Sequence, residues 1–180
     1  MAFCPLIEIK IPVMNKSWCT LIVHCLILFG FLTSCEKPDV VEDPELLNNL
    51  YKESKDTVEI EGSKYILETE LSRNFMPGGP IPTKRLLVAF VMLVNLDSVT
   101  VPDYIKITKL YVIKDQLIWI SQPKDSNQPQ IPDFKLYKVS TDGPEWETDK
   151  YVDVIIEITN NLNKNKFLLI AKQQYIMRLE

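Results

Sequence analysis

Along most of the chain, apolar and polar positions alternate in short runs that are separated by turn-forming residues. Such a period of two predicts β-strands, because successive side chains of a strand point to opposite faces of its sheet. The clearest case is the run 151–159, whose predicted inward side chains are Val152, Val154, Ile156 and Ile158. Eight strands are predicted in all, over residues 57–61, 64–73, 85–96, 104–113, 117–121, 134–139, 151–159 and 166–179.

The run 85–96 has a different pattern, because it is continuously apolar from Leu86 to Val94. We expect it to be a strand in the middle of the fold with both of its faces buried. A helix is the alternative for this run. Its β-branched residues and the turn-forming sequence 95–98 that follows it favour the strand.

One short helix is predicted before the strands. Asp43 is suited to cap its N-terminus and Pro44 to occupy its first position. The side chains that then fall on one helical face are Leu46, Leu47, Leu50 and Tyr51. Residues 36–43 are polar and acidic and predict a tether, so that the expected boundaries are 35–44 for a lipidated tether and 45–180 for the folded domain.

Short strands with turn signals at nearly regular spacing predict an all-β fold, an antiparallel β-sandwich of about seven or eight strands. The pattern loosely resembles the immunoglobulin-like sandwiches. Trp119 lies in the middle of a strand as a candidate core residue, and Tyr151 opens the penultimate strand, where those folds often have a tyrosine corner. The paired cysteines of that family are missing, and no glycine precedes Tyr151. A small closed barrel is the alternative architecture.

The first residues of the chain follow a third pattern. Residues 19–32 are almost wholly apolar, and Lys10 and Lys16 precede them with no acid between the two lysines. A basic start followed by an apolar middle is typical of a secretory signal. The apolar middle is shorter than the roughly 20 residues of a membrane-spanning helix. Residues 1–13 include two prolines and an acid, which are unusual in such a leader, so we expect translation to begin at Met14.

The apolar run ends in Leu32-Thr33-Ser34-Cys35, which resembles the lipobox of bacterial lipoproteins. The resemblance covers this segment alone. It implies that residues 1–34 are a type II signal peptide and that Cys35 becomes a lipidated N-terminus anchored to the cell envelope, on the periplasmic or the surface face of the outer membrane. Two or more acyl chains anchor a protein firmly, whereas one binds only marginally. The alternatives are an uncleaved membrane anchor and an ordinary signal peptide without lipidation.

Composition changes the picture once this leader is removed. All four cysteines and the only histidine precede residue 36, so the folded part would have neither residue type. This excludes disulfides, Ser-His and Cys-His nucleophiles and the usual zinc ligands from that part. Cleavage before Cys35 would leave 18 basic and 23 acidic side chains, a formal net charge of −5. That charge, without a basic stripe, argues against nucleic-acid binding, and we predict neither a metal nor a cofactor.

Without histidine or cysteine, paired carboxylates are the remaining route to hydrolysis, as in glycosidases. Glu68 and Glu70 form one such pair and Glu145 and Glu147 another. Acids two positions apart on a strand, however, usually form its solvated face. A carboxylate-dependent hydrolase is therefore the alternative function, and we predict no catalytic residue.

Two loops are candidate binding sites. Trp146, between Glu145 and Glu147, has the pattern of an aromatic ring that stacks on a sugar while the neighbouring acceptors bind its hydroxyl groups. Phe75 and Met76, in the segment 75–80, form an apolar loop that would suit a peptide or protein partner. The alternative for both is that Trp146 and Phe75 cap the core. The sequence thus predicts a lipid-anchored, non-catalytic binding module for a glycan, a peptide or an envelope protein.

Overall fold

The computed structural model describes residues 38–76, 85–126 and 131–180. The chain divides into two compact units, and all described residues belong to the second unit, Lys37–Glu180. The predicted leader and Cys35 therefore lie outside the described residues, as do residues 77–80 of the second candidate loop. Within the described ranges, no helix is long and apolar enough to cross a membrane.

All eight predicted strands occur, together with the helix and one further strand. In chain order the elements are β1 (Asp39–Glu42), α2 (Pro44–Glu53), β2 (Val58–Ile60), β3 (Ser63–Asn74), β4 (Val88–Asn95), β5 (Ile105–Lys114), β6 (Leu117–Ser121), β7 (Lys135–Ser140), β8 (Tyr151–Asn160) and β9 (Lys166–Leu179). The extra strand, β1, lies in the segment that was predicted as a tether. It pairs with β6. Val40 packs against the inner core, and Val41 packs on the other face of the sheet, against the apolar side chains that α2 covers. These contacts favour a strand over a solvated tether.

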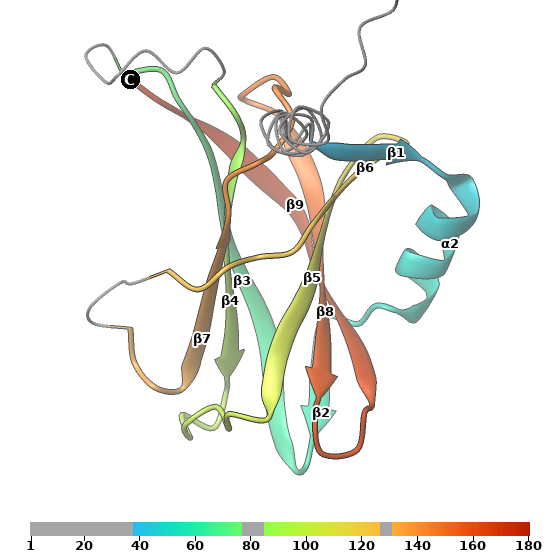
Figure 1. Ribbon diagram of the computed structural model, residues 1–180, viewed down its shortest axis with the longest axis vertical. Coiled ribbons are helices and arrows are strands. Elements are labelled where there is room, and N and C mark those ends of the chain that lie inside the picture. The colour runs from blue at the N-terminus through green and yellow to red at the C-terminus, as the bar shows by residue number, and fades with distance from the viewer. Residues whose placement is uncertain (1–37, 77–84, 127–130) are drawn as a thin grey trace, which may run out of the picture. The chain divides into compact units, whose positions relative to one another are not determined.

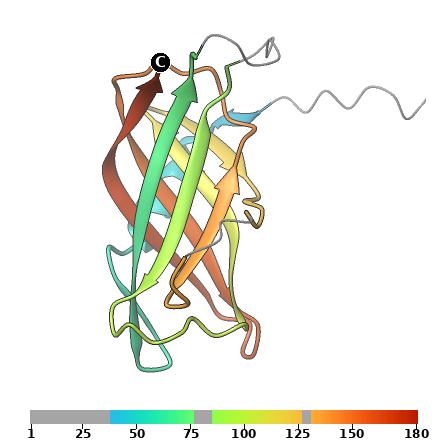
Figure 2. The same cartoon turned by 90° about the vertical axis from the view of Figure 1, so that its left-hand side faces the viewer.

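The strands form one sheet in the order β1-β6-β5-β8-β9-β3-β4-β7, with β2 attached to β3. The sheet curls into a half-barrel, so that β5 and β8 face β3 and β4 across the core (Figures 1 and 2). Described strand pairs are antiparallel except for β3 and β9, which run parallel. The all-β class is confirmed, but the sheet is mixed, and the antiparallel immunoglobulin-like sandwich is not confirmed. The reason is that β9 pairs with β8 along its first part and with β3 at its end.

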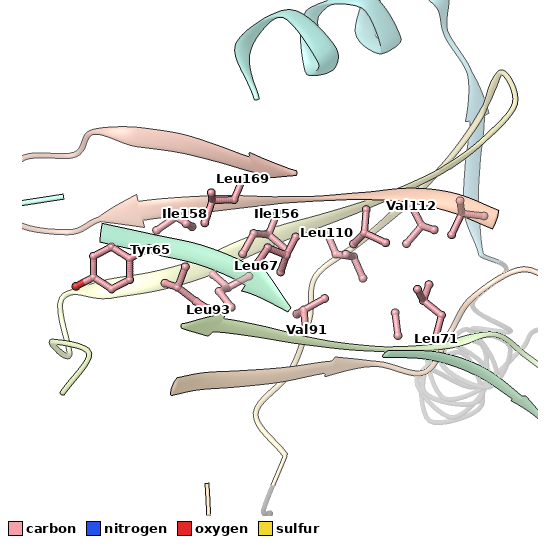
Figure 3. Close-up of a cluster of buried hydrophobic side chains, with 14 of the residues drawn as sticks. Tyr65, Leu67, Leu71, Val91, Leu93, Leu110, Val112, Ile156, Ile158 and Leu169 are labelled. Carbon is pink, nitrogen blue, oxygen red and sulfur yellow. The ribbon is translucent and has the colours of Figure 1, made fainter. Parts of the chain in front are cut away.

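The inner core lies between the two facing parts of the sheet (Figure 3). Trp119 is fully buried there, as predicted. The four predicted inward residues of β8 are buried as well: Val152, Val154, Ile156 and Ile158. Tyr151, in contrast, is 66% exposed and its ring lies 5.4 Å from that of Tyr175, so it does not form a tyrosine corner.

Strand β4 is buried mainly on one face, which corrects the prediction of burial on both. Ala89, Val91 and Leu93 have no exposed surface, whereas Phe90 is half-buried and stacks on Tyr137 with ring centroids 5.8 Å apart. The physical reason is the position of the helix. Helix α2 covers the outer face of β5, β6, β8 and β9 and not that of β4 (Figure 1).

Helix α2 begins as the sequence predicts. The Asp43 Oδ1 atom accepts hydrogen bonds from the backbone N–H groups of Glu45 and Leu46, at 3.0 and 2.9 Å. These bonds satisfy two of the donors that a helix N-terminus leaves free. On its inner side, Leu50 is buried against Tyr111 and the neighbouring outer side chains of the sheet.

Candidate functional site

The two candidate loops meet at one end of the half-barrel, and Arg73 joins them. The Arg73 Nη1 atom donates hydrogen bonds to the backbone oxygen of Trp146 at 2.6 Å and of Glu145 at 3.3 Å. Its Nε atom donates to the backbone oxygen of Arg85 at 2.7 Å. Phe75 lies two residues after Arg73, directly beyond the end of β3, and its ring centroid is 5.1 Å from the guanidinium carbon of Arg73. The segments 75–76 and 145–146 are therefore parts of one site.

The alternation of β3 explains why Arg73 lies there. Tyr65, Leu67 and Leu71 share the core-facing side of this strand, and Arg73 and Phe75 continue the same side beyond the apolar core. Strand β9 has a matching arrangement, in which Arg178 follows the buried Ile176 at a spacing of two. Because the parallel register sets Arg73 opposite Arg178, the inward side of both strands ends in arginine.

All three arginines of the chain converge on the Phe75 ring. The guanidinium carbons of Arg73, Arg85 and Arg178 lie 5.1, 4.7 and 4.4 Å from the ring centroid. Each of these distances is within the range of a cation–π contact. We call Phe75 and these three residues the arginine cluster.

Positive charge is in excess at this cluster. The Nε atom of Arg178 is 2.6 Å from a carboxylate oxygen of Glu180, whereas the hydrogen bonds of Arg73 go to neutral carbonyl groups. Arg85 has no ion pair with any described residue. Guanidinium groups hold carboxylates and phosphates through paired N–H donors. The exposed guanidinium groups of Arg85 and Arg178 are thus suited to bind an anionic group.

The side chains of the Trp146 loop are divided between core and solvent. Trp146 is half-buried and packs against the inner core, in line with the alternative that it caps this core. Glu145 and Glu147 are exposed, and Glu147 lies 3.8 Å from the ammonium group of Lys150. The loop therefore contributes backbone oxygens to the arginine cluster, and its carboxylates make no ion pair with the arginines among the described residues.

Two apolar side chains lie at the rim of the cluster. Met76, directly after Phe75, is 55% exposed, and Leu179, directly after Arg178, is 36% exposed. The ends of strands β3 and β9 are joined by a hydrogen bond from the Phe75 N–H to the Leu179 oxygen, at 2.8 Å. Met76 and Leu179 are therefore exposed at the same end of the sheet as the arginines, although Leu179 lies on the opposite face of β9 from Arg178.

A groove of about 550 Å³ lies far along β9 from the cluster, between the end of α2, β2 and the start of β9. Glu157 lines this groove and accepts hydrogen bonds from Lys166 at 3.1 Å and from Thr108 at 2.9 Å. Burial is the largest single influence and raises the pKa of Glu157, but these two hydrogen bonds together with the positive charges of Lys166 and Lys109 outweigh it and hold the pKa below its ordinary value. The groove therefore has an ionised carboxylate at this position and not a proton donor.

The glutamates of the predicted carboxylate pairs are partly or fully exposed. Glu68 makes an ion pair with Lys135 at 2.7 Å, while Glu70 is exposed on the same strand. In the part of the chain that the structure describes, no three acids, cysteines or histidines come close enough to hold a metal ion.

The arginines were not predicted from the sequence as site residues, because they are far apart in the chain and form no motif. The available signal was their position, since Arg73 and Arg178 continue the inward faces of their strands. Comparisons of the chain with models of protein families, with curated proteins and with solved structures found no match.

Proposed function

We propose that this protein is a non-catalytic binding module that holds an anionic group of a partner molecule at the arginine cluster. The observation that carries this proposal is that all three arginines of the chain surround one ring, while a single carboxylate, that of Glu180, pairs with them among the described residues. Like charges at such spacing repel one another, and a bound anion relieves that repulsion.

The chemistry of the cluster narrows the ligand to a carboxylate or phosphate group. Arg85 and Arg178 are exposed, and only the Nε atom of Arg178 is paired, with Glu180, so N–H donors of both guanidinium groups remain for a ligand. An acidic glycan, an acidic peptide or an acidic patch of an envelope protein carries such groups. Hydrolysis receives no comparable support, because Glu157 has a lowered pKa and Glu68 is held by Lys135.

We further propose that the module is exported and attached to the cell envelope through a lipid on Cys35. The support is the apolar run that ends in Leu32-Thr33-Ser34-Cys35. Labelling cells with a fatty-acid analogue should mark the natural chain and not the Cys35→Ala variant. Equal label in both, or label in neither, would contradict lipidation. Changing Met1 should leave expression intact if translation begins at Met14.

Anion binding can be tested on the full chain by following arginine Nε–H resonances while inorganic phosphate or acetate is added. The resonances of Arg85 and Arg178 should shift in a saturable way. In the Arg85→Gln variant the apparent affinity should fall about ten-fold, as expected for the loss of one charge-assisted hydrogen bond. The matched control is Lys106→Gln, which removes one exposed positive charge near the opposite end of the sheet. Unshifted arginine resonances, or equal losses in both variants, would refute the proposal.

A further inference from the structure

The rim of the arginine cluster has the composition of a surface that contacts phospholipids. Exposed Met76 and Leu179 directly follow Phe75 and Arg178 in the sequence, at the end of the sheet where Arg85 and Arg178 are exposed. Surfaces that lie in a membrane interface combine basic side chains, which bind headgroup phosphates, with apolar side chains that enter the acyl boundary. An acidic glycan would use the arginines but would leave the two exposed apolar side chains without a role.

The distribution of charge favours an orientation in which the arginine cluster faces an anionic surface. The chain downstream of residue 34 has a formal net charge of −5, yet all of its arginines lie in this cluster. An anionic surface would therefore attract this end of the sheet and repel a predominantly acidic remainder.

The proposed lipid anchor on Cys35 is joined to the domain at the end of the sheet that carries the arginine cluster. Strand β1 begins at Asp39, and Figures 1 and 2 both show β1 and the C-terminal end of β9 toward the same end of the sheet. Four residue steps separate Asp39 from Cys35, which corresponds to about 14 Å of fully extended chain. A lipid on Cys35 would thus keep this end of the domain close to the headgroups.

We propose that the arginine cluster binds the phosphate groups of phospholipids in the membrane that holds the anchor. Arg85 and Arg178 are the phosphate ligands, and Met76 and Leu179 enter the interface beside them. Arg73 is a positioning residue, because its Nε and Nη1 atoms donate to backbone oxygens of the neighbouring segments. This inference rests on the proposed anion binding and on the proposed lipid anchor, and it names the anion.

Trp146 provides a reporter for the test, because it lies next to Arg73 while Trp119 is fully buried. The full chain is reconstituted into vesicles of phosphatidylcholine, with or without phosphatidylglycerol, that contain lipids brominated near the headgroup. Bromine quenches tryptophan fluorescence at short range. The same measurement on a Trp146→Phe variant isolates the signal of Trp146 from that of the other tryptophans.

We expect quenching of Trp146 in the vesicles that contain phosphatidylglycerol. Arg85→Gln and Arg178→Gln should each weaken the contact about five-fold, since one basic residue near an anionic surface contributes roughly this factor. Lys106→Gln should leave the quenching unchanged. Absence of quenching in the unaltered chain, or equal quenching in the double arginine variant, would overturn the inference. If inorganic phosphate still shifts the arginine resonances, the membrane assignment alone has failed and the proposed anion binding stands.

Discussion

Replacing Gly143 by alanine is expected to lower the free energy of unfolding by about 3 kcal/mol, because no space exists for a methyl group. Gly143 is buried at the start of the loop that carries Trp146, and its N–H donates to the Leu87 oxygen at 3.1 Å. An added Cβ would lie 2.5 Å from that oxygen, 2.7 Å from the Leu87 Cβ atom and 2.9 Å from the Cη2 atom of Trp119.

The magnitude follows from which atoms are in the way. Overpacking a core usually costs about 1–3 kcal/mol, depending on how well the neighbours move aside. Here the nearest atom is a backbone oxygen of Leu87, and the third belongs to the fully buried Trp119, so neither has a free direction in which to move. The cost should therefore lie at the upper end of that range. For a domain of this size it corresponds to a drop in Tm of about 6–12 °C.

Urea unfolding of the full chain, followed by far-ultraviolet circular dichroism, measures this loss. The matched control is Gly62→Ala, at a position where the backbone φ is +85° but nothing lies within 4 Å of the added atom. That variant carries only the strain of a left-handed conformation, about 1 kcal/mol. If both variants unfold at the same urea concentration, the close approach of Gly143 to Leu87 and Trp119 is not what the fold depends on.

Three further outcomes are expected from unfolding measurements. Phe90→Ala should lower the free energy of unfolding by about 2 kcal/mol, which is below the 3–5 kcal/mol typical of a fully buried aromatic, because Phe90 is only half-buried. Leu93→Ala should lower it by about 3 kcal/mol, because Leu93 is fully buried. Equal stability of Leu93→Ala and the unaltered chain would contradict this. Glu157 has a lowered pKa, so its stabilising contribution is complete above the ordinary value of 4.5 and is lost as the pH falls through the folded-state pKa. The stability gap between the unaltered chain and Glu157→Gln should accordingly narrow in acid, and a gap that widens there would refute the assigned sign. Asp43→Ala should cost about 1 kcal/mol through loss of the helix cap, and no change would show that the cap bonds contribute nothing.

Local structure was predictable because it is encoded in local patterns. The period-two alternation of β8 and the cap at Asp43 each concern neighbouring residues, and both predictions are confirmed. Pairing was not predictable in the same way. The alternation of β9 shows which of its side chains face inward, but it does not show which strand pairs with β9 or whether the two run parallel. The burial of β4 was overestimated for a related reason, since its continuous apolar run does not reveal that α2 covers other strands.

For the site, the sequence located two loops and missed what connects them. Phe75 and Trp146 were candidates as aromatic residues in separate turns, and the structure brings both into contact with Arg73. The three arginines are distant in sequence, at positions 73, 85 and 178. Arg73 and Arg178 are brought together by the parallel pairing of β3 with β9, and Arg85 precedes β4, which pairs with β3 on its other side. No local pattern encodes either pairing.

The difference between Arg73 and the other two arginines bears on the function of the cluster. Arg73 has a structural role, because its guanidinium group satisfies three backbone oxygens where the core ends. Arg85 and Arg178 are exposed, and their contacts with the described residues are the Phe75 ring and, for Arg178, the carboxylate of Glu180. Closing the end of the half-barrel requires only the first of these three charges. The Glu180 carboxylate balances Arg178 in part, whereas Arg85 has no ion pair with a described residue. In the proposed function, a bound anion relieves the repulsion that remains among the three charges.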